Sequence, residues 1–84
     1  MNKKIVFEIA NVHCYCGMKP EEIPKSVEIG GTVHEVKKII DRWYEGSETA
    51  GKPVFNYFKV ELENGVIILL RYNTRHEVWS LKRL

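Results

Sequence analysis

The chain has 84 residues, a formal net charge of +2, 44% hydrophobic residues and 29% charged residues. These values are typical of one soluble domain, and they exclude an intrinsically disordered chain, which has fewer apolar residues and more net charge. The longest apolar run, residues 66–70, is far shorter than the roughly 18 residues of a membrane span, and Glu8 interrupts the apolar stretch that a signal peptide would need.

The N-terminal third divides into a predicted strand and a predicted loop. Residues 3–12 are rich in β-branched and aromatic residues, which favours a strand within the N-terminal segment 1–12. Residues 13–26 contain both cysteines, a glycine and two prolines, and this composition is typical of a loop.

Residues 27–44 allow two interpretations. In the first, Thr32 caps a helix, Glu35 completes a capping box, and apolar side chains recur on one helical face. In the second, Gly30-Gly31 forms a two-residue hairpin turn and a strand follows, with a bulge or a change of face near Ile39-Ile40. The pattern of residues alone does not decide between the helix and the strand.

The C-terminal half predicts three consecutive antiparallel strands. Residues 58–63 alternate between apolar and charged, and Asn64-Gly65 is the preferred two-residue hairpin turn, in which both residues take a positive φ. Residues 66–72 form a continuous apolar run, as expected of a central strand covered on both faces. Residues 73–76 interrupt the pattern, and residues 78–81 predict a last strand.

Residues 24–84 contain a series of motifs that resembles a family of small prokaryotic β-rich domains of unknown function. The shared positions are Gly31, Val36, Ile39-Ile40-Asp41-Arg42-Trp43, Tyr57-Phe58-Lys59-Val60, Gly65, Ile67 to Tyr72 and Trp79-Ser80-Leu81. The resemblance implies a small, strongly bent β-meander similar to SH3-like barrels, with residues 32–44 as a strand. Some relatives are associated with DNA-repair polymerases, which makes nucleic acid a partner to consider.

We therefore predict a single, mainly β domain over residues 1–84, in which residues 27–84 form the meander. The expected architecture is an SH3-like barrel or antiparallel meander of roughly five or six strands. The alternative is an α+β fold with a helix at residues 32–44.

The sequence His13-Cys14-Tyr15-Cys16 is the first candidate site. Thiolates and imidazoles bind zinc, so His13, Cys14 and Cys16 supply up to three ligands of a metal site. In a strand, however, His13 would point away from the two thiols, and Cys-x-Cys is not the usual spacing of zinc ligands. Without an export signal, both cysteines are expected to be reduced and buried in a cytoplasmic protein, with no bound cofactor.

The second candidate site combines basic and aromatic residues. Small β-barrels bind single-stranded nucleic acid by stacking bases on aromatic rings while cations follow the phosphates. The predicted contact residues are Lys38, Arg42, Trp43, Arg71, Tyr72 and Arg75. The same residue types also build the core and the ordinary surface of a small barrel. The sequence pI of about 8.6 is below the value above 9 that is typical of dedicated nucleic-acid modules.

Catalytic motifs are not evident in the sequence, since it has no phosphate-binding glycine loop, nucleophile elbow or zinc-protease helix motif. We therefore expect a small cytoplasmic binding or assembly module without catalytic activity. Its alternatives are a nucleic-acid-binding barrel and a thiol-based metal protein. The N-terminal strand, residues 4–12, would either close the barrel within one chain or pair across a homodimer through an edge strand.

Overall fold

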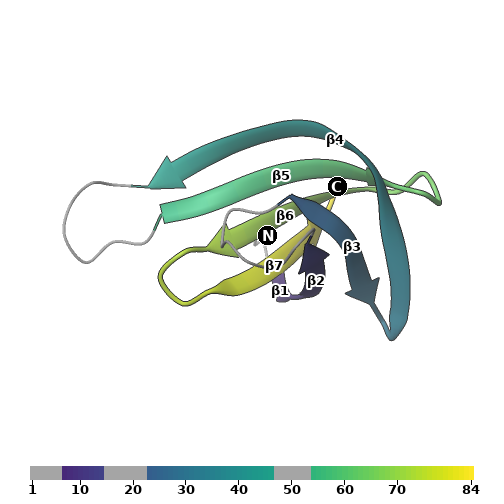
Figure 1. Cartoon of the computed structure of the whole chain (residues 1–84), viewed down its shortest axis with the longest axis horizontal. Coiled ribbons are helices and arrows are strands. Elements are labelled where there is room, and N and C mark those ends of the chain that lie inside the picture. The colour runs from purple at the N-terminus through teal and green to yellow at the C-terminus, as the bar shows by residue number, and fades with distance from the viewer. Residues whose placement is uncertain (1–6, 15–22, 47–53) are drawn as a thin grey trace, which may run out of the picture.

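The computed structural model describes residues 7–14, 23–46 and 54–84, and they form a curled antiparallel sheet of seven strands (Figure 1). The strands are β1 (Glu8–Ile9), β2 (Asn11–Cys14), β3 (Pro24–Ile29), β4 (Thr32–Gly46), β5 (Val54–Leu62), β6 (Ile67–Asn73) and β7 (Val78–Arg83). Their order in the sheet is β1-β7-β6-β5-β4-β3-β2. The mainly β prediction is confirmed, and no helix is present among the described residues, so none of them forms a helix that could cross a membrane.

Strand β4 is the longest element, and it bends around the molecule (Figure 1). Its first residues, Thr32 to Glu35, pair with β3, and the remainder pairs with β5. The pairing with β5 shifts register between Val36 and Lys38 and again between Ile39 and Asp41. At each shift β4 contains one residue more than the facing stretch of β5. Such a bulge increases the local twist and bends the strand. The strand over residues 32–44 and its bulge near Ile39-Ile40 are therefore confirmed, and the helix alternative is wrong.

The two ends of the sheet belong to one short N-terminal segment. Strand β1 pairs with β7, while β2 pairs with β3 at the opposite end of the strand order. Ala10 separates them, and its backbone N–H donates to the carbonyl oxygen of Trp79 at 3.0 Å. The segment thus joins both ends of the curled sheet within one chain. The expected five or six strands become seven because the predicted single N-terminal strand changes partners at Ala10.

The loop predicted over residues 13–26 is shorter than expected at both ends. Cys14 still belongs to β2, and β3 begins at Pro24, where a proline is tolerated because the first residue of a strand need not donate to the ladder. Residues 15–22 of that loop, which include Cys16, lie outside the described residues.

Two glycine turns connect the central strands. Gly30 and Gly31 have φ values of 58° and 83°, and Ile29 pairs directly with Thr32, which confirms the two-residue turn. The turn at Asn64-Gly65 is in the predicted place but has a different type. Only Gly65, at 88°, has a positive φ, and the N–H of Leu62 donates to the Val66 oxygen at 2.8 Å around a three-residue connection. A turn followed by a left-handed glycine is the usual geometry of such a loop.

Replacing Gly31 with alanine should lower the free energy of unfolding by about 1 kcal/mol, because an L side chain at this φ is strained. A Cβ at Gly31 would meet nothing within 4 Å, so the loss would come from the backbone conformation alone. Urea unfolding of G31A measures this loss of stability. The G31N variant should lose less unfolding free energy than G31A, because asparagine tolerates the left-handed region. Equal stability of G31A and the wild type would contradict this account of the turn.

The hydrophobic core lies inside the curl of the sheet. From residue 55 onward, strand β5 alternates strictly between half-buried and buried residues, and β6 follows the same period from Ile68. The buried hydrophobic residues are Ala10, Val27, Phe58, Val60, Leu62, Ile68, Leu70, Tyr72 and Leu81. The other face of β6 is only partly covered, so the expectation of a central strand buried on both faces holds for one face.

Candidate functional site

The strand register decides which side chains share a face of the sheet, because directly opposed residues on antiparallel strands point to the same side. One row across β4, β5, β6 and β7 consists of Trp43, Tyr57, Arg71 and Ser80. The neighbouring row consists of Arg42, Phe58, Leu70 and Leu81. Its last three residues are buried in the core, so this row lies on the inner face, where Arg42 is exposed at the edge. The six residues predicted to contact nucleic acid are therefore divided. Trp43 and Arg71 lie on the outer face, while Arg42 and Tyr72 lie on the inner face.

The outer face holds a continuous group of rings around one guanidinium. This outer aromatic patch consists of Phe7, Trp43, Phe55, Tyr57 and Arg71, all partly buried. The Trp43 and Tyr57 rings stack with centroids 5.1 Å apart and planes within 6°. Tyr57 also contacts Phe7 edge-on, with centroids 6.4 Å apart, and Phe55 at 6.3 Å. These contacts join four rings from β4, β5 and the start of the described chain into one surface.

Arg71 lies among the rings of this patch. Its Cζ is 3.9 Å from the Phe7 ring centroid and 4.7 Å from the Phe55 ring centroid. Both distances are within the range of a cation–π interaction, and the two rings hold the guanidinium in place. A positioned guanidinium next to a stacked Trp–Tyr pair can accept an anion and a flat ring at the same time.

The charges around the patch are mixed. By register, Asp41, Lys59, Leu69 and Lys82 form the next outer row. Glu45 accepts a hydrogen bond from Trp43 Nε1 at 3.1 Å and so fixes the indole. The outer face around the patch therefore carries two lysines and Arg71 together with two carboxylates. Electrostatic attraction for an anionic partner is consequently modest and sensitive to salt.

The inner-face residues have structural partners. Arg42 Cζ lies 4.9 Å from the Phe58 ring centroid, and Arg42 Nη2 donates to the Tyr44 hydroxyl at 3.2 Å. Tyr72 is 6% exposed, and its ring lies 4.9 Å from that of Trp79. Burial raises the pKa of the Tyr72 hydroxyl, and electrostatic interaction with Glu77 and Cys14 raises this pKa further. Tyr72 therefore stays neutral at physiological pH and belongs to the core.

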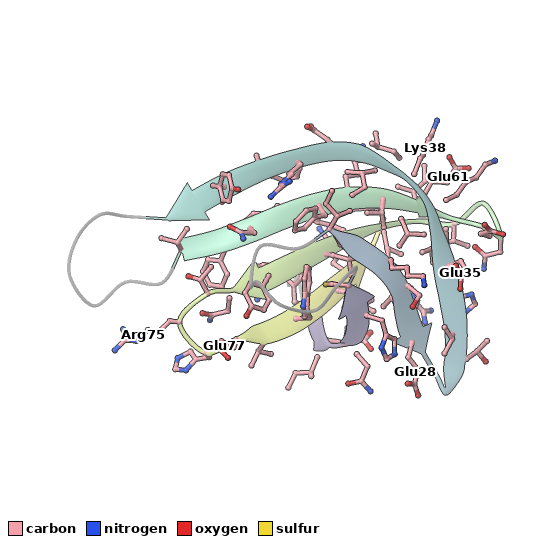
Figure 2. The ribbon with its side chains drawn as sticks, viewed as in Figure 1. Glu28, Glu35, Lys38, Glu61, Arg75 and Glu77 are labelled. Atoms are coloured by element: carbon pink, nitrogen blue, oxygen red, sulfur yellow. The ribbon has the colours of Figure 1, made fainter. Side chains whose placement is uncertain are left out.

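The remaining two predicted contacts lie far from each other. Lys38 projects beside Glu61, with 3.8 Å between Nζ and Oε1, whereas Arg75 lies in the β6–β7 connection at the opposite end of the molecule (Figure 2). That connection is ordered by Asn73, whose Oδ1 accepts hydrogen bonds from the backbone N–H groups of Arg75 and His76. The six predicted residues thus do not form one surface.

The thiol site is described only in part. His13 is exposed and Cys14 is half-buried, so the two neighbours differ in exposure as expected for a strand. Cys16 lies outside the described residues. Within the described ranges no group of three or more His, Cys, Asp or Glu side chains is placed to hold a metal ion.

The structure adds three residues to the candidate surface that the predicted contact set omitted, namely Phe7, Phe55 and Tyr57. The available signal was the alternation within residues 54–62, where Phe55 and Tyr57 are out of phase with the buried Phe58 and Val60. Phe7 could not be assigned, because its place depends on where the N-terminal segment pairs.

Comparison of the chain with protein-family models, with curated proteins and with solved structures finds no match.

Proposed function

We propose that this protein is a small binding module without catalytic activity, and that its outer aromatic patch contacts single-stranded nucleic acid. The observation that carries the proposal is the Trp43–Tyr57 stack beside the ring-held guanidinium of Arg71. Single-strand-binding barrels use the same two elements, aromatic rings for the bases and cations for the phosphates. The curled sheet is proposed to be of the SH3-like type, as the resemblance of residues 24–84 implied.

The stack is open to extension at its Trp43 end. Beyond Glu35, β4 has no described partner strand on the side away from β5, so Trp43 is the last ring of the row. A base placed against the outer side of the indole would continue the Tyr57–Trp43 stack. Each such base is worth about 1–3 kcal/mol of binding free energy and needs no particular sequence.

Three cations on the same face are available for phosphates, namely Lys59, Arg71 and Lys82. If all three contact phosphates, the logarithm of the association constant should fall with the logarithm of salt concentration with a slope of about −2. The proposal includes a cytoplasmic location.

Replacing Trp43 with leucine should weaken binding of a fluorescein-labelled oligothymidylate roughly five- to hundredfold, because one stacking ring is lost. Fluorescence anisotropy at low salt measures the dissociation constant, and circular dichroism verifies that the variant is folded. Tyr44→Leu is the matched control, since Tyr44 is the next aromatic residue of β4 but points to the inner face and is 58% exposed. It should leave binding unchanged.

A second pair of variants tests the charge. Arg71→Gln should weaken binding and reduce the salt slope, whereas Arg75→Gln, which removes the same charge at the β6–β7 connection, should change little. Equal losses in both variants, or an unmodified protein that binds no oligonucleotide at low salt, would overturn the proposal.

A homodimer through an edge strand is the second candidate, and it is favoured by the side of β4 on which the structure describes no partner strand. Ile40 and Tyr44 are 42% and 58% exposed along that edge. The two bulges and the charged side chains of this stretch oppose regular pairing with another strand. Sedimentation equilibrium at increasing concentration decides the matter, and a monomer at every concentration would remove this candidate.

A further inference from the structure

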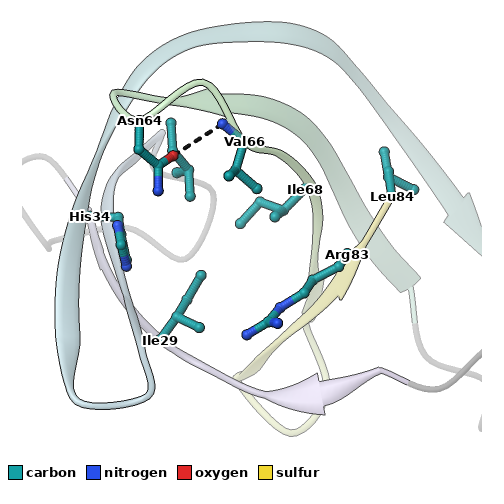
Figure 3. A pocket seen from close by; sticks show the side chains of 8 residues that line it. Ile29, His34, Asn64, Val66, Ile68, Arg83 and Leu84 are labelled. Atoms are coloured by element: carbon teal, nitrogen blue, oxygen red, sulfur yellow. Dashed lines mark hydrogen bonds between the residues drawn. The ribbon is translucent and has the colours of Figure 1, made fainter.

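A cavity of about 320 Å³ lies at one end of the curled sheet (Figure 3), and no residue of the outer aromatic patch lines it. The β3–β4 hairpin, the β5–β6 turn and the end of β7 surround it. Its lining residues are Ile29, His34, Leu62, Asn64, Val66, Ile68, Arg83 and Leu84. The volume is at the lower end of the range for small-molecule sites.

The inner wall of the cavity is apolar. Leu62 and Ile68 are fully buried core residues, and Ile29 packs against the same core. Val66 and Leu84 are 43% and 62% exposed and form the rim. An aliphatic or aromatic group entering the cavity would therefore lie against the hydrophobic core, where burial of apolar area is favourable.

The polar side chains of the cavity are Asn64, His34 and Arg83, and what they offer is mainly hydrogen-bond donors. Asn64 Oδ1 accepts a hydrogen bond from the backbone N–H of Val66 at 3.0 Å. This bond fixes the side-chain amide, so that its nitrogen points toward the cavity on the side of His34 (Figure 3). Arg83 extends toward the cavity from the opposite wall (Figure 3). None of the eight lining side chains carries a carboxylate.

A small apolar wall with donors on both sides complements one class of ligand. A guanidinium presents a planar pair of N–H groups that matches a carboxylate, and an amide N–H supplies a further donor. A phosphate group would carry more charge than one arginine and one amide can compensate in a site with apolar walls. We propose that this cavity binds a small monocarboxylate with an apolar body, its carboxylate at Arg83 and Asn64 and its body against Leu62 and Ile68.

The direct test is a titration of the full chain with sodium hexanoate. The backbone and methyl NMR signals of Val66 and Ile68 report binding during the titration. We expect saturable shifts confined to the cavity residues. Hexan-1-ol, which has the same body without the charge, should bind at least tenfold more weakly, and acetate, which lacks the body, should also bind at least tenfold more weakly. Equal affinity for hexanoate and hexan-1-ol would overturn the proposal, as would shifts that do not saturate.

Two variants test the donors. Asn64→Asp keeps the oxygen that accepts from Val66 but replaces the donating nitrogen with a charged oxygen, so it should weaken hexanoate binding at least tenfold while preserving the turn. Arg83→Gln should do the same. Lys82→Gln is the matched control, because Lys82 is the next residue of β7, carries the same charge and points to the outer face. An unchanged affinity in Arg83→Gln, or an equal loss in Lys82→Gln, would contradict the assignment.

The cavity and the nucleic-acid proposal can fail separately. Trp43 lies on the outer face and does not line the cavity, so Trp43→Leu should leave hexanoate binding unchanged.

Discussion

Replacing Phe58 with alanine is expected to lower the free energy of unfolding by about 3–5 kcal/mol, which is close to the whole stability of a domain of this size. Phe58 is fully buried on β5, and its ring lies 5.7 Å from that of Trp79 and 4.9 Å from the Arg42 guanidinium. Truncation would leave a cavity under all of these contacts. Urea unfolding, monitored by the near-ultraviolet circular dichroism of the aromatic side chains, measures the loss of stability.

Phe55→Ala is the matched control for this prediction. It is the same substitution on the same strand, but Phe55 lies on the outer face and is only half-buried. The loss of unfolding free energy should therefore be markedly smaller than for Phe58→Ala. If Phe58→Ala unfolds the chain completely, Phe58→Leu retains a measurable transition with a loss of about 1.5 kcal/mol. Equal losses for Phe55→Ala and Phe58→Ala would show that the inner face is not the main core.

Replacing Asn56 with leucine should raise the free energy of unfolding by about 1–3 kcal/mol. Asn56 is 1% exposed, and neither its Nδ2 nor its Oδ1 has a hydrogen-bond partner among the residues that the structure describes. A buried amide without partners loses its hydration and gains nothing in return, and leucine has nearly the same size and shape without that cost. The midpoint of urea unfolding should therefore move to higher concentration.

Asn56→Ala and Asn56→Asp set the scale of this effect. Alanine removes the amide but leaves space between Tyr44 and Tyr72, which lie opposite Asn56 on the neighbouring strands. The alanine variant should therefore gain less unfolding free energy than the leucine variant. Aspartate buries a charge and should lose stability. A leucine variant less stable than the alanine variant would mean that the amide is satisfied in solution.

The turns and the strands next to them could be predicted from local sequence. Gly30-Gly31 and Gly65 mark the chain reversals, because few other residues take a positive φ. The strand from Thr32 was not decided by its own pattern, because two register shifts in β4 break the simple alternation of faces. The division of the N-terminal strand at Ala10 also could not be predicted, since it depends on pairing with two distant strands.

The candidate surface was only partly predictable for the same reason. Neighbouring residues on a strand point to opposite faces, so a choice of the adjacent pairs Arg42-Trp43 and Arg71-Tyr72 necessarily mixed inner and outer residues. The phase of the alternation, rather than the residue types, decides which member of each pair is available to a ligand. In β4 that phase changes at each bulge, and only the three-dimensional pairing reveals it.

The pairing of Glu8 with Leu81 has a consequence for how the chain folds. The first described strand can form this pairing only after the chain has been synthesised as far as β7, so the sheet closes after every other described strand has been made. Contacts between residues so distant in sequence carry a large entropic cost before they are rewarded, and topologies that depend on them acquire their native structure in milliseconds to seconds. Until then, the hydrophobic side chains inside the curl lack the segment that joins the two ends of the sheet, which makes this interval the one most exposed to aggregation.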